Sequence, residues 1–154
     1  MADDVYRLAR FLDAQESVYG QALAELQAGR KRSHWMWFIF PQLRGLGRSP
    51  TAAHFGIGSP AEAEAYLAQP LLGARLREAT AAVLGHRQRL LHAIFGSPDD
   101  LKFCSCMTLF NRVNPLTQNV FLSALNDFCG GKEDTAAVAL LAADGNEGRE
   151  RRLP

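Results

Sequence analysis

Apolar residues recur at helical spacing through the first 29 positions of the chain. Asp3 or Asp4 is a candidate N-cap for this segment, and Gly29 is a candidate stop. The polar stretch 15–17 shifts the phase of the pattern. We therefore expect either one bent helix or two helices in series, carried by the apolar positions Val5, Leu8, Leu12, Tyr19, Leu23 and Leu26.

Four dipeptides of one kind divide the rest of the chain: Ser49-Pro50, Ser59-Pro60, Ser97-Pro98 and Asn114-Pro115. A Ser or Asn oxygen can accept a free amide of the first helical turn, and the following proline has no amide to leave unpaired. Each dipeptide therefore predicts a helix start, and Glu62 completes a capping box at the second. The predicted helices span 50–55, 60–68, 70–84, 87–95, 98–112, 115–129 and 134–142.

The wholly apolar run 35–40 is compatible with a buried strand or a buried helix. A lone strand has no pairing partner here, because no alternating run of strand length stands out elsewhere. We expect a short buried helix that ends at Pro41. The predicted fold is mainly α, a compact bundle of about seven to nine short helices with no significant sheet.

Length and composition limit the class of protein. A chain of 154 residues has the size of one domain, and 47% apolar with 21% charged residues is typical of a globular protein. We therefore place a single helical domain at residues 1–143. Residues 144–152 contain no apolar side chain, so 144–154 is predicted to be a disordered tail.

The formal net charge of +1 gives no global field that would attract nucleic acid or an acidic membrane. Five basic residues and no acidic one lie between Gly29 and Pro50, namely Arg30, Lys31, Arg32, Arg44 and Arg48. An electrostatic partner would therefore have to be bound by this local cluster.

Cysteine usage and hydropathy predict a cytoplasmic protein with no membrane partner. Three cysteines do not make a disulfide framework, and we interpret all three as small core residues. The longest apolar run is far too short to span a bilayer. No CxxC pair or His spacing completes a zinc site, so we expect neither a metal nor a cofactor.

The segment 34–42 is the first candidate for chemistry. Trp35 and Trp37 lie beside Lys31, Gln42 and Arg44, and flat rings next to cations can hold a nucleobase and its phosphates. The alternative is that the segment nucleates the core, which we expect for residues 38–40.

Two further segments carry candidate polar groups. The loop 43–50 combines Arg44 with Ser49 at a helix start, a generic anion site, although a plain capped turn is the alternative. Lys102, Ser105 and Thr108 share one stripe of a predicted helix that can face a ligand cavity. Alternatively, the two hydroxyls only bond the preceding turn.

Candidate acids and bases are Glu78, with Asp100 as a substitute, and His34. A carboxylate near arginines can act as a general base or stabilise the cleavage of a glycosidic bond, but a surface ion pair with Arg75 or Arg77 is equally compatible. His34 is either a proton carrier or a core histidine with satisfied hydrogen bonds.

The strings Lys31–Gln42, Gly45–Ser49 and the residues 105–110 resemble the bacterial domain-of-unknown-function 1810 family, over about residues 3 to 142. The resemblance implies a compact, mainly helical fold and no settled activity. Members often carry the label calpastatin, which these residues do not support, because a calpain inhibitor of that kind would be extended and repetitive.

Two functional hypotheses follow. The first is a cleft that binds a nucleotide-like or ADP-ribose-like small molecule, with hydrolysis of a glycosidic bond as its extension. The second is a non-enzymatic module that binds nucleic acid or a protein. A third interpretation is that the whole segment is core and basic surface.

Overall fold

The computed structural model describes the backbone of residues 4–152 and the side chains of residues 4–143. Within this part of the chain ten helices are joined by short loops, and the predicted mainly-α class is confirmed. Leu43 and Ile57 form an isolated parallel β-bridge. The helices are α1 (Ala9–Glu16), α2 (Tyr19–Gln27), α3 (Met36–Ile39), α4 (Pro50–Phe55), α5 (Pro60–Ala68), α6 (Pro70–Leu84), α7 (Leu91–Phe95), α8 (Asp99–Val113), α9 (Val120–Phe128) and α10 (Thr135–Arg152).

The N-terminal segment forms two helices in series, α1 and α2, which confirms the second of the two predicted alternatives. The Asp4 carboxylate accepts the amides of Leu8 (2.6 Å) and Ala9 (2.8 Å), so this acid satisfies free donors at the start of α1. After α2 the chain turns at Gly29, whose φ of +78° lies in the region that glycine adopts without strain.

Two of the Ser-Pro dipeptides open helices as predicted. Ser49 Oγ accepts the amide of Ala52 (3.0 Å) and Ser59 Oγ accepts the amide of Glu62 (3.1 Å). The predicted ranges of α4, α5 and α6 match the structure. Glu62, however, accepts the amide of Gly58 (3.1 Å) instead of completing a capping box.

The prediction that Asn114-Pro115 opens a helix is wrong. Asn114 ends α8, and its side chain accepts the amide of Leu116 (2.9 Å) in a local turn. The helix α9 starts later because Asn119 Oδ1 accepts the amides of Phe121 and Leu122, both at 3.0 Å. The cap of α9 is an asparagine, as predicted, but the residue is Asn119 and not Asn114.

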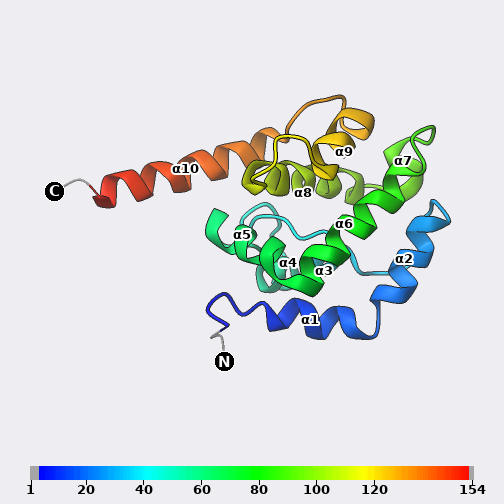
Figure 1. Cartoon of the computed structure of the whole chain (residues 1–154), viewed down its shortest axis with the longest axis horizontal. Helices are drawn as coiled ribbons and strands as arrows, with labels where there is room; N and C mark the ends of the chain where they lie inside the picture. Colours follow the sequence, from blue (N-terminus) through cyan, green and yellow to red (C-terminus); the bar gives the residue numbers. More distant parts are fainter. Residues whose placement is uncertain (1–3, 153–154) are drawn as a thin grey trace.

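The core is built around aromatic rings from α3, α7 and α8. Phe103 lies with its ring centre 5.2 Å from that of Phe40 and 5.0 Å from that of Phe95, and Trp35 is 6.2 Å from Phe40. Figure 1 shows α8, α9 and α10 along one side, α1 along the other, and α3 to α6 between them. The predicted short buried helix is confirmed as α3.

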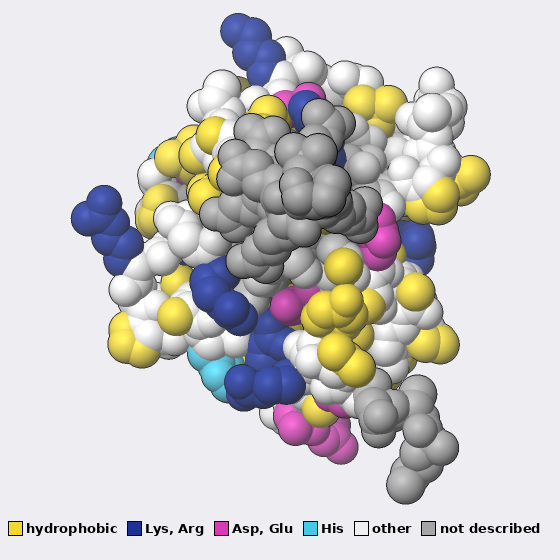
Figure 2. Space-filling view, turned by 90° about the vertical axis from the view of Figure 1, so that its left-hand side faces the viewer, with side chains coloured by type: hydrophobic (Ala, Val, Ile, Leu, Met, Phe, Trp, Pro, Cys, Tyr) yellow, Lys and Arg dark blue, Asp and Glu magenta, His cyan; other side chains and the backbone are white. Residues whose placement is uncertain are grey.

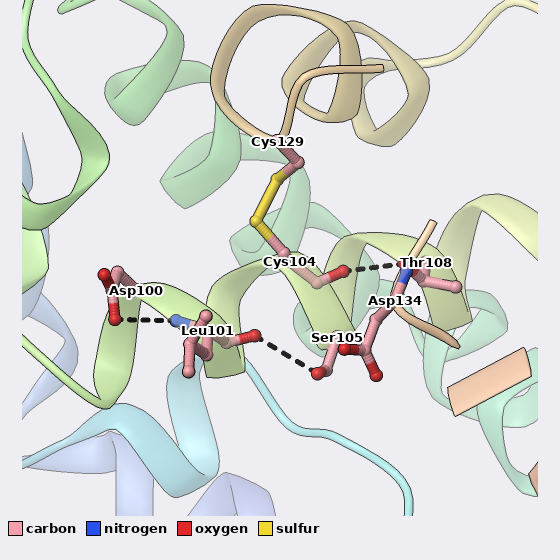
Figure 3. The surroundings of a disulfide bond; sticks show 7 residues. All are labelled: Asp100, Leu101, Cys104, Ser105, Thr108, Cys129 and Asp134. Atoms are coloured by element: carbon pink, nitrogen blue, oxygen red, sulfur yellow. Dashed lines mark hydrogen bonds between the residues drawn. A yellow bond between two sulfur atoms is a disulfide. The ribbon is translucent and has the colours of Figure 1, made fainter. Parts of the chain in front are cut away.

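The interpretation of all three cysteines as separate core residues is wrong for two of them. Cys104 on α8 and Cys129, which follows α9, form a disulfide with Cα atoms 6.0 Å apart (Figure 3). They are 25 residues apart, and only the packing of α9 on α8 brings them together. Cys106 is free and buried, as expected. Cysteine usage therefore no longer supports the prediction of a cytoplasmic protein.

At the C-terminus, α10 extends beyond the predicted helix 134–142. Residues 153 and 154, and the side chains of 144–152, are outside the described residues, so the predicted disorder of this tail stays a prediction. No helix in the described part of the chain has the length and hydropathy needed to cross a membrane.

Reduction of the disulfide is expected to lower the free energy of unfolding by about 3 kcal/mol, because a cross-link closing 25 residues restricts the unfolded chain. Differential scanning calorimetry with and without dithiothreitol should show a melting temperature lower by several degrees in the reductant. A protein with both Cys104→Ser and Cys129→Ser is the control and should not respond to dithiothreitol. An unchanged melting temperature on reduction, with three free thiols in the reduced unfolded protein, would contradict the expectation.

Candidate functional site

The buried carboxylate of Glu25 organises the candidate segment, and the sequence did not single it out. Glu25 Oε1 accepts the indole N–H of Trp35 (3.0 Å) and the amides of Arg32 (2.7 Å) and Ser33 (3.0 Å). Glu25 Oε2 accepts the hydroxyl of Ser33 (2.6 Å). The sequence indicated only that a buried indole N–H needs a hydrogen-bond acceptor, and it did not show that Glu25 is that acceptor.

Burial raises the pKa of Glu25, but its hydrogen bonds outweigh burial. The Ser33 hydroxyl, the amides of Arg32 and Ser33 and the Trp35 indole all stabilise the ionised form, and the pKa falls from 4.5 to about 2. The carboxylate is therefore charged at neutral pH although only 8% of the residue is exposed.

The two tryptophans have different environments. Trp35 is completely buried, so its ring has no face open to a ligand. Trp37 is half-buried and is the second residue of the short helix α3. Of the two indoles, only Trp37 can serve as a stacking surface.

A lysine ammonium lies over the ring of each tryptophan, and both lysines form ion pairs with the Asp99 carboxylate. Lys31 Nζ lies 5.2 Å from the Trp35 ring centre and 3.0 Å from Asp99 Oδ2. Lys102 Nζ lies 5.0 Å from the Trp37 ring centre and 3.5 Å from Asp99 Oδ1. The group has a net charge of +1 and joins segments that are far apart in the sequence. Asp99 was missed, although its spacing of three from Lys102 is a usual pattern for a helical ion pair.

Three predicted ligand-binding residues line one crevice. Trp37, Gln42 and Lys102 meet Phe55 of α4 there, together with Met36, Phe40, Ala52 and Gly56. The crevice has a volume of about 10 Å³, room for about one water molecule. The loop before α4 packs closely beside it, because a Cβ atom at Gly47 would lie 2.6 Å from that of Ala52.

Arg44 and Ser49 lie outside this crevice. Arg44 donates to the Gly56 carbonyl (3.2 Å), which also accepts from Arg10 (3.1 Å). The arginine borders a separate hollow of about 210 Å³ that Ile57 also lines. Figure 2, seen from the α10 end, shows Lys and Arg side chains gathered beside a histidine on that face. Ser49 is exposed and caps α4, which is the capped-turn alternative.

On α8, the hydroxyls of Ser105 and Thr108 bond the preceding helical turn, which was the alternative to facing a ligand cavity. Ser105 Oγ donates to the Leu101 carbonyl (3.1 Å) and Thr108 Oγ1 donates to the Cys104 carbonyl (2.8 Å), as Figure 3 shows. Thr108 Oγ1 also accepts the amide of Asp134 (2.9 Å) and is fully buried. Thr108 therefore joins α8 to the start of α10, and neither hydroxyl lines the crevice.

The candidate acids and His34 are not at the crevice either. Glu78 is exposed on α6 and hydrogen-bonds the hydroxyl of Tyr19, whose pKa is raised by burial and then by this carboxylate. Asp100 Oδ2 lies 3.6 Å from His92 Nδ1. His34 is exposed, which excludes the core interpretation. In the part of the chain that is described, no group of His, Cys, Asp and Glu could hold a metal ion.

Comparisons with known proteins give a family but no activity. The family model described as "Protein of unknown function (DUF1810)" matches residues 5–141. The crystal structure of the conserved hypothetical protein Rv1873 from Mycobacterium tuberculosis is similar, with 54% sequence identity and a TM-score of 0.88. The similarity covers 90% of this chain and 99% of that chain. No curated protein matches the chain.

The replacement Glu25→Gln is expected to lower the free energy of unfolding at pH 7 by about 2 to 3 kcal/mol, because five donors, the Gln21 side-chain amide among them, lose a charged acceptor. Since the folded-state pKa is depressed, this contribution is present above about pH 4.5 and is lost as the pH falls toward 2. Urea unfolding at several pH values measures it. The exposed Glu64→Gln is the control. Equal stability of the two variants at pH 7 would show that Glu25 does not organise the segment.

Proposed function

The chain belongs to the DUF1810 family, whose activity is unknown, and on that premise we propose that it binds a nucleotide-like or ADP-ribose-like small molecule at the Trp37–Lys102 crevice. The observation that carries the proposal is the half-buried Trp37 ring with the Lys102 ammonium 5.0 Å from its centre. An indole beside an ammonium matches the two chemical parts of a nucleotide, a flat base and a phosphate.

The charge of the site favours an anionic ligand. Lys31 and Lys102 share Asp99 as their carboxylate partner, so one positive charge is in excess. Both lysines are attached to the packed body of the protein, since the Lys31 amide donates to the Ile94 carbonyl (2.7 Å) and Lys102 is on α8. A phosphate that approaches Lys102 therefore meets a cation whose backbone is held in place by α8.

Polar recognition of a base edge is available from Gln42. Its side-chain amide has both a donor and an acceptor, and it lines the crevice beside Trp37. The Phe55 ring on the opposite wall supplies apolar contact. Small ligand sites are commonly of this composition, with mostly apolar walls and a few polar groups that set orientation.

The crevice must widen for a ring to enter, because it now has room for only about one water molecule. Lys102 is the mobile part. Its side chain is 23% exposed, and its ion pair with Asp99 is a partly exposed contact of modest strength at 3.5 Å. A base takes the place of the ammonium on the indole face, and the displaced ammonium pairs with the phosphate.

The proposal is binding without hydrolysis. None of the residues that line the crevice is an acid, and Asp99 beside it is engaged by two lysines. Glu78 is hydrogen-bonded to Tyr19 on the α2–α6 surface, and Asp100 lies beside His92. A hydrolase of this class needs a carboxyl group at the bond that breaks.

Titration with AMP and ADP-ribose tests the proposal through tryptophan fluorescence and melting temperature. Because Trp35 is buried, quenching by the ligand should come from Trp37 and disappear in Trp37→Phe. A ligand present at about 100 times its Kd stabilises the fold by about 2.7 kcal/mol. Lys102→Met is expected to weaken binding at least tenfold.

Lys132→Met is the matched control, since this exposed lysine lies far along the chain and forms no ion pair among the described residues. It should bind as the unaltered protein does. No stabilisation by either ligand at about 10 mM, or equal weakening in both lysine variants, would overturn the proposal.

A further inference from the structure

Two basic segments that are far apart in the sequence lie side by side at one end of the molecule. We call residues 27–32 and 84–90 the basic tip. His86 Nε2 is 2.9 Å from the Gln27 carbonyl, and Arg89 donates to the Gly29 carbonyl (3.3 Å). The contact is close, because a Cβ atom at Gly29 would lie 3.0 Å from the His86 ring. In Figure 1 the end of α2 and the turn between α6 and α7 meet at the right-hand edge.

The basic tip concentrates positive charge in a protein that is nearly neutral. It contains five Lys and Arg and no Asp or Glu, while the whole chain has a net charge of +1, so the remainder has a net charge of −4. This asymmetry favours one orientation toward a polyanion.

The arginines of the basic tip face solvent. Arg30 and Arg32 are exposed on either side of Lys31, which turns inward to Asp99. Neither arginine forms an ion pair in the described part of the chain, and nor does the exposed Arg89. Arg87 is paired with Asp127 at 3.0 Å, but 67% of its side chain remains exposed.

A wide, open groove of about 800 Å³ runs along the turn after α6, lined by His86, Arg87, Gln88 and Arg89 with Ala81, Leu84 and Gly85. His86 and Arg89 have a structural role as well, since they engage the carbonyl groups at the end of α2. The side chains of Arg30, Arg32 and Arg87 have no part in that contact, so capping of α2 does not account for their guanidinium groups.

We propose that the basic tip binds the phosphate backbone of duplex nucleic acid without reading its sequence. Guanidinium groups suit phosphate oxygens. Arg87 and Arg89 line the groove, and the exposed Arg30 and Arg32 lie on the adjoining segment, so that together they can contact successive phosphates. The tip has no Trp, Tyr or Phe, so it lacks the stacking surface that single-strand binding uses. Leu90 is its one strongly exposed apolar side chain, which is too little for insertion into a membrane.

Fluorescence anisotropy with a labelled duplex of about 20 base pairs tests the proposal over a range of salt concentrations. Contact with about four phosphates predicts a slope of about −3.6 for log K against log salt. The double variant Arg30→Gln, Arg32→Gln should lower the affinity at least tenfold at about 50 mM salt and make the slope about 1.8 less steep.

The matched control removes two exposed cations elsewhere, through Arg48→Gln with Lys132→Gln, and should change the affinity less than twofold. Trp37→Phe should leave duplex binding unchanged, which separates the basic tip from the crevice. Equal losses in both double variants would mean that only net charge matters, and would overturn the proposal. So would binding to phosphatidylserine vesicles without duplex binding, or tighter binding of single strands.

Discussion

The hydrogen bonds to the buried Glu25 carboxylate hold the chain between α2 and α3, and the rest of the candidate region depends on them. Residues 28–35 are not part of a helix, so their amides need partners outside a regular ladder. Glu25 accepts two of those amides and the Trp35 indole with one side chain. Once Trp35 is held in the core, α3 starts in a fixed orientation and Trp37 comes to lie at the surface.

The helix α8 connects this region with the rest of the fold. Lys102 lies over Trp37, the next residue stacks in the aromatic core, and Cys104 is linked to the end of α9. Thr108 joins the same helix to the start of α10. A crevice between α3, α4 and α8 therefore has one wall that is anchored at several points along its length. Ligand entry as proposed needs movement of the Lys102 side chain alone, because the helix is anchored.

The three cations of the segment 30–32 have two different roles, which depend on whether the side chain points inward or toward solvent. Lys31 turns inward to Asp99 and Trp35, and its side chain is only 9% exposed. Arg30 and Arg32, on either side of it, are exposed to solvent. One short basic run thus contributes both to the ion pair beside the crevice and to the basic tip.

The sequence by itself determined most of the local structure, because capping and helical periodicity are local interactions. Ser49, Ser59 and the apolar spacing predicted α4, α5 and α6 correctly, and the run 35–40 predicted α3. Only the tertiary structure decided which candidates meet. Trp37, Gln42 and Lys102 line one crevice, while Glu78 lies on another surface. The Lys31–Asp99 ion pair and the Cys104–Cys129 disulfide were hidden because tertiary packing brings together segments distant in the sequence. Glu25 was hidden because its partners lie in the irregular segment after α2, whose path no periodic pattern predicts.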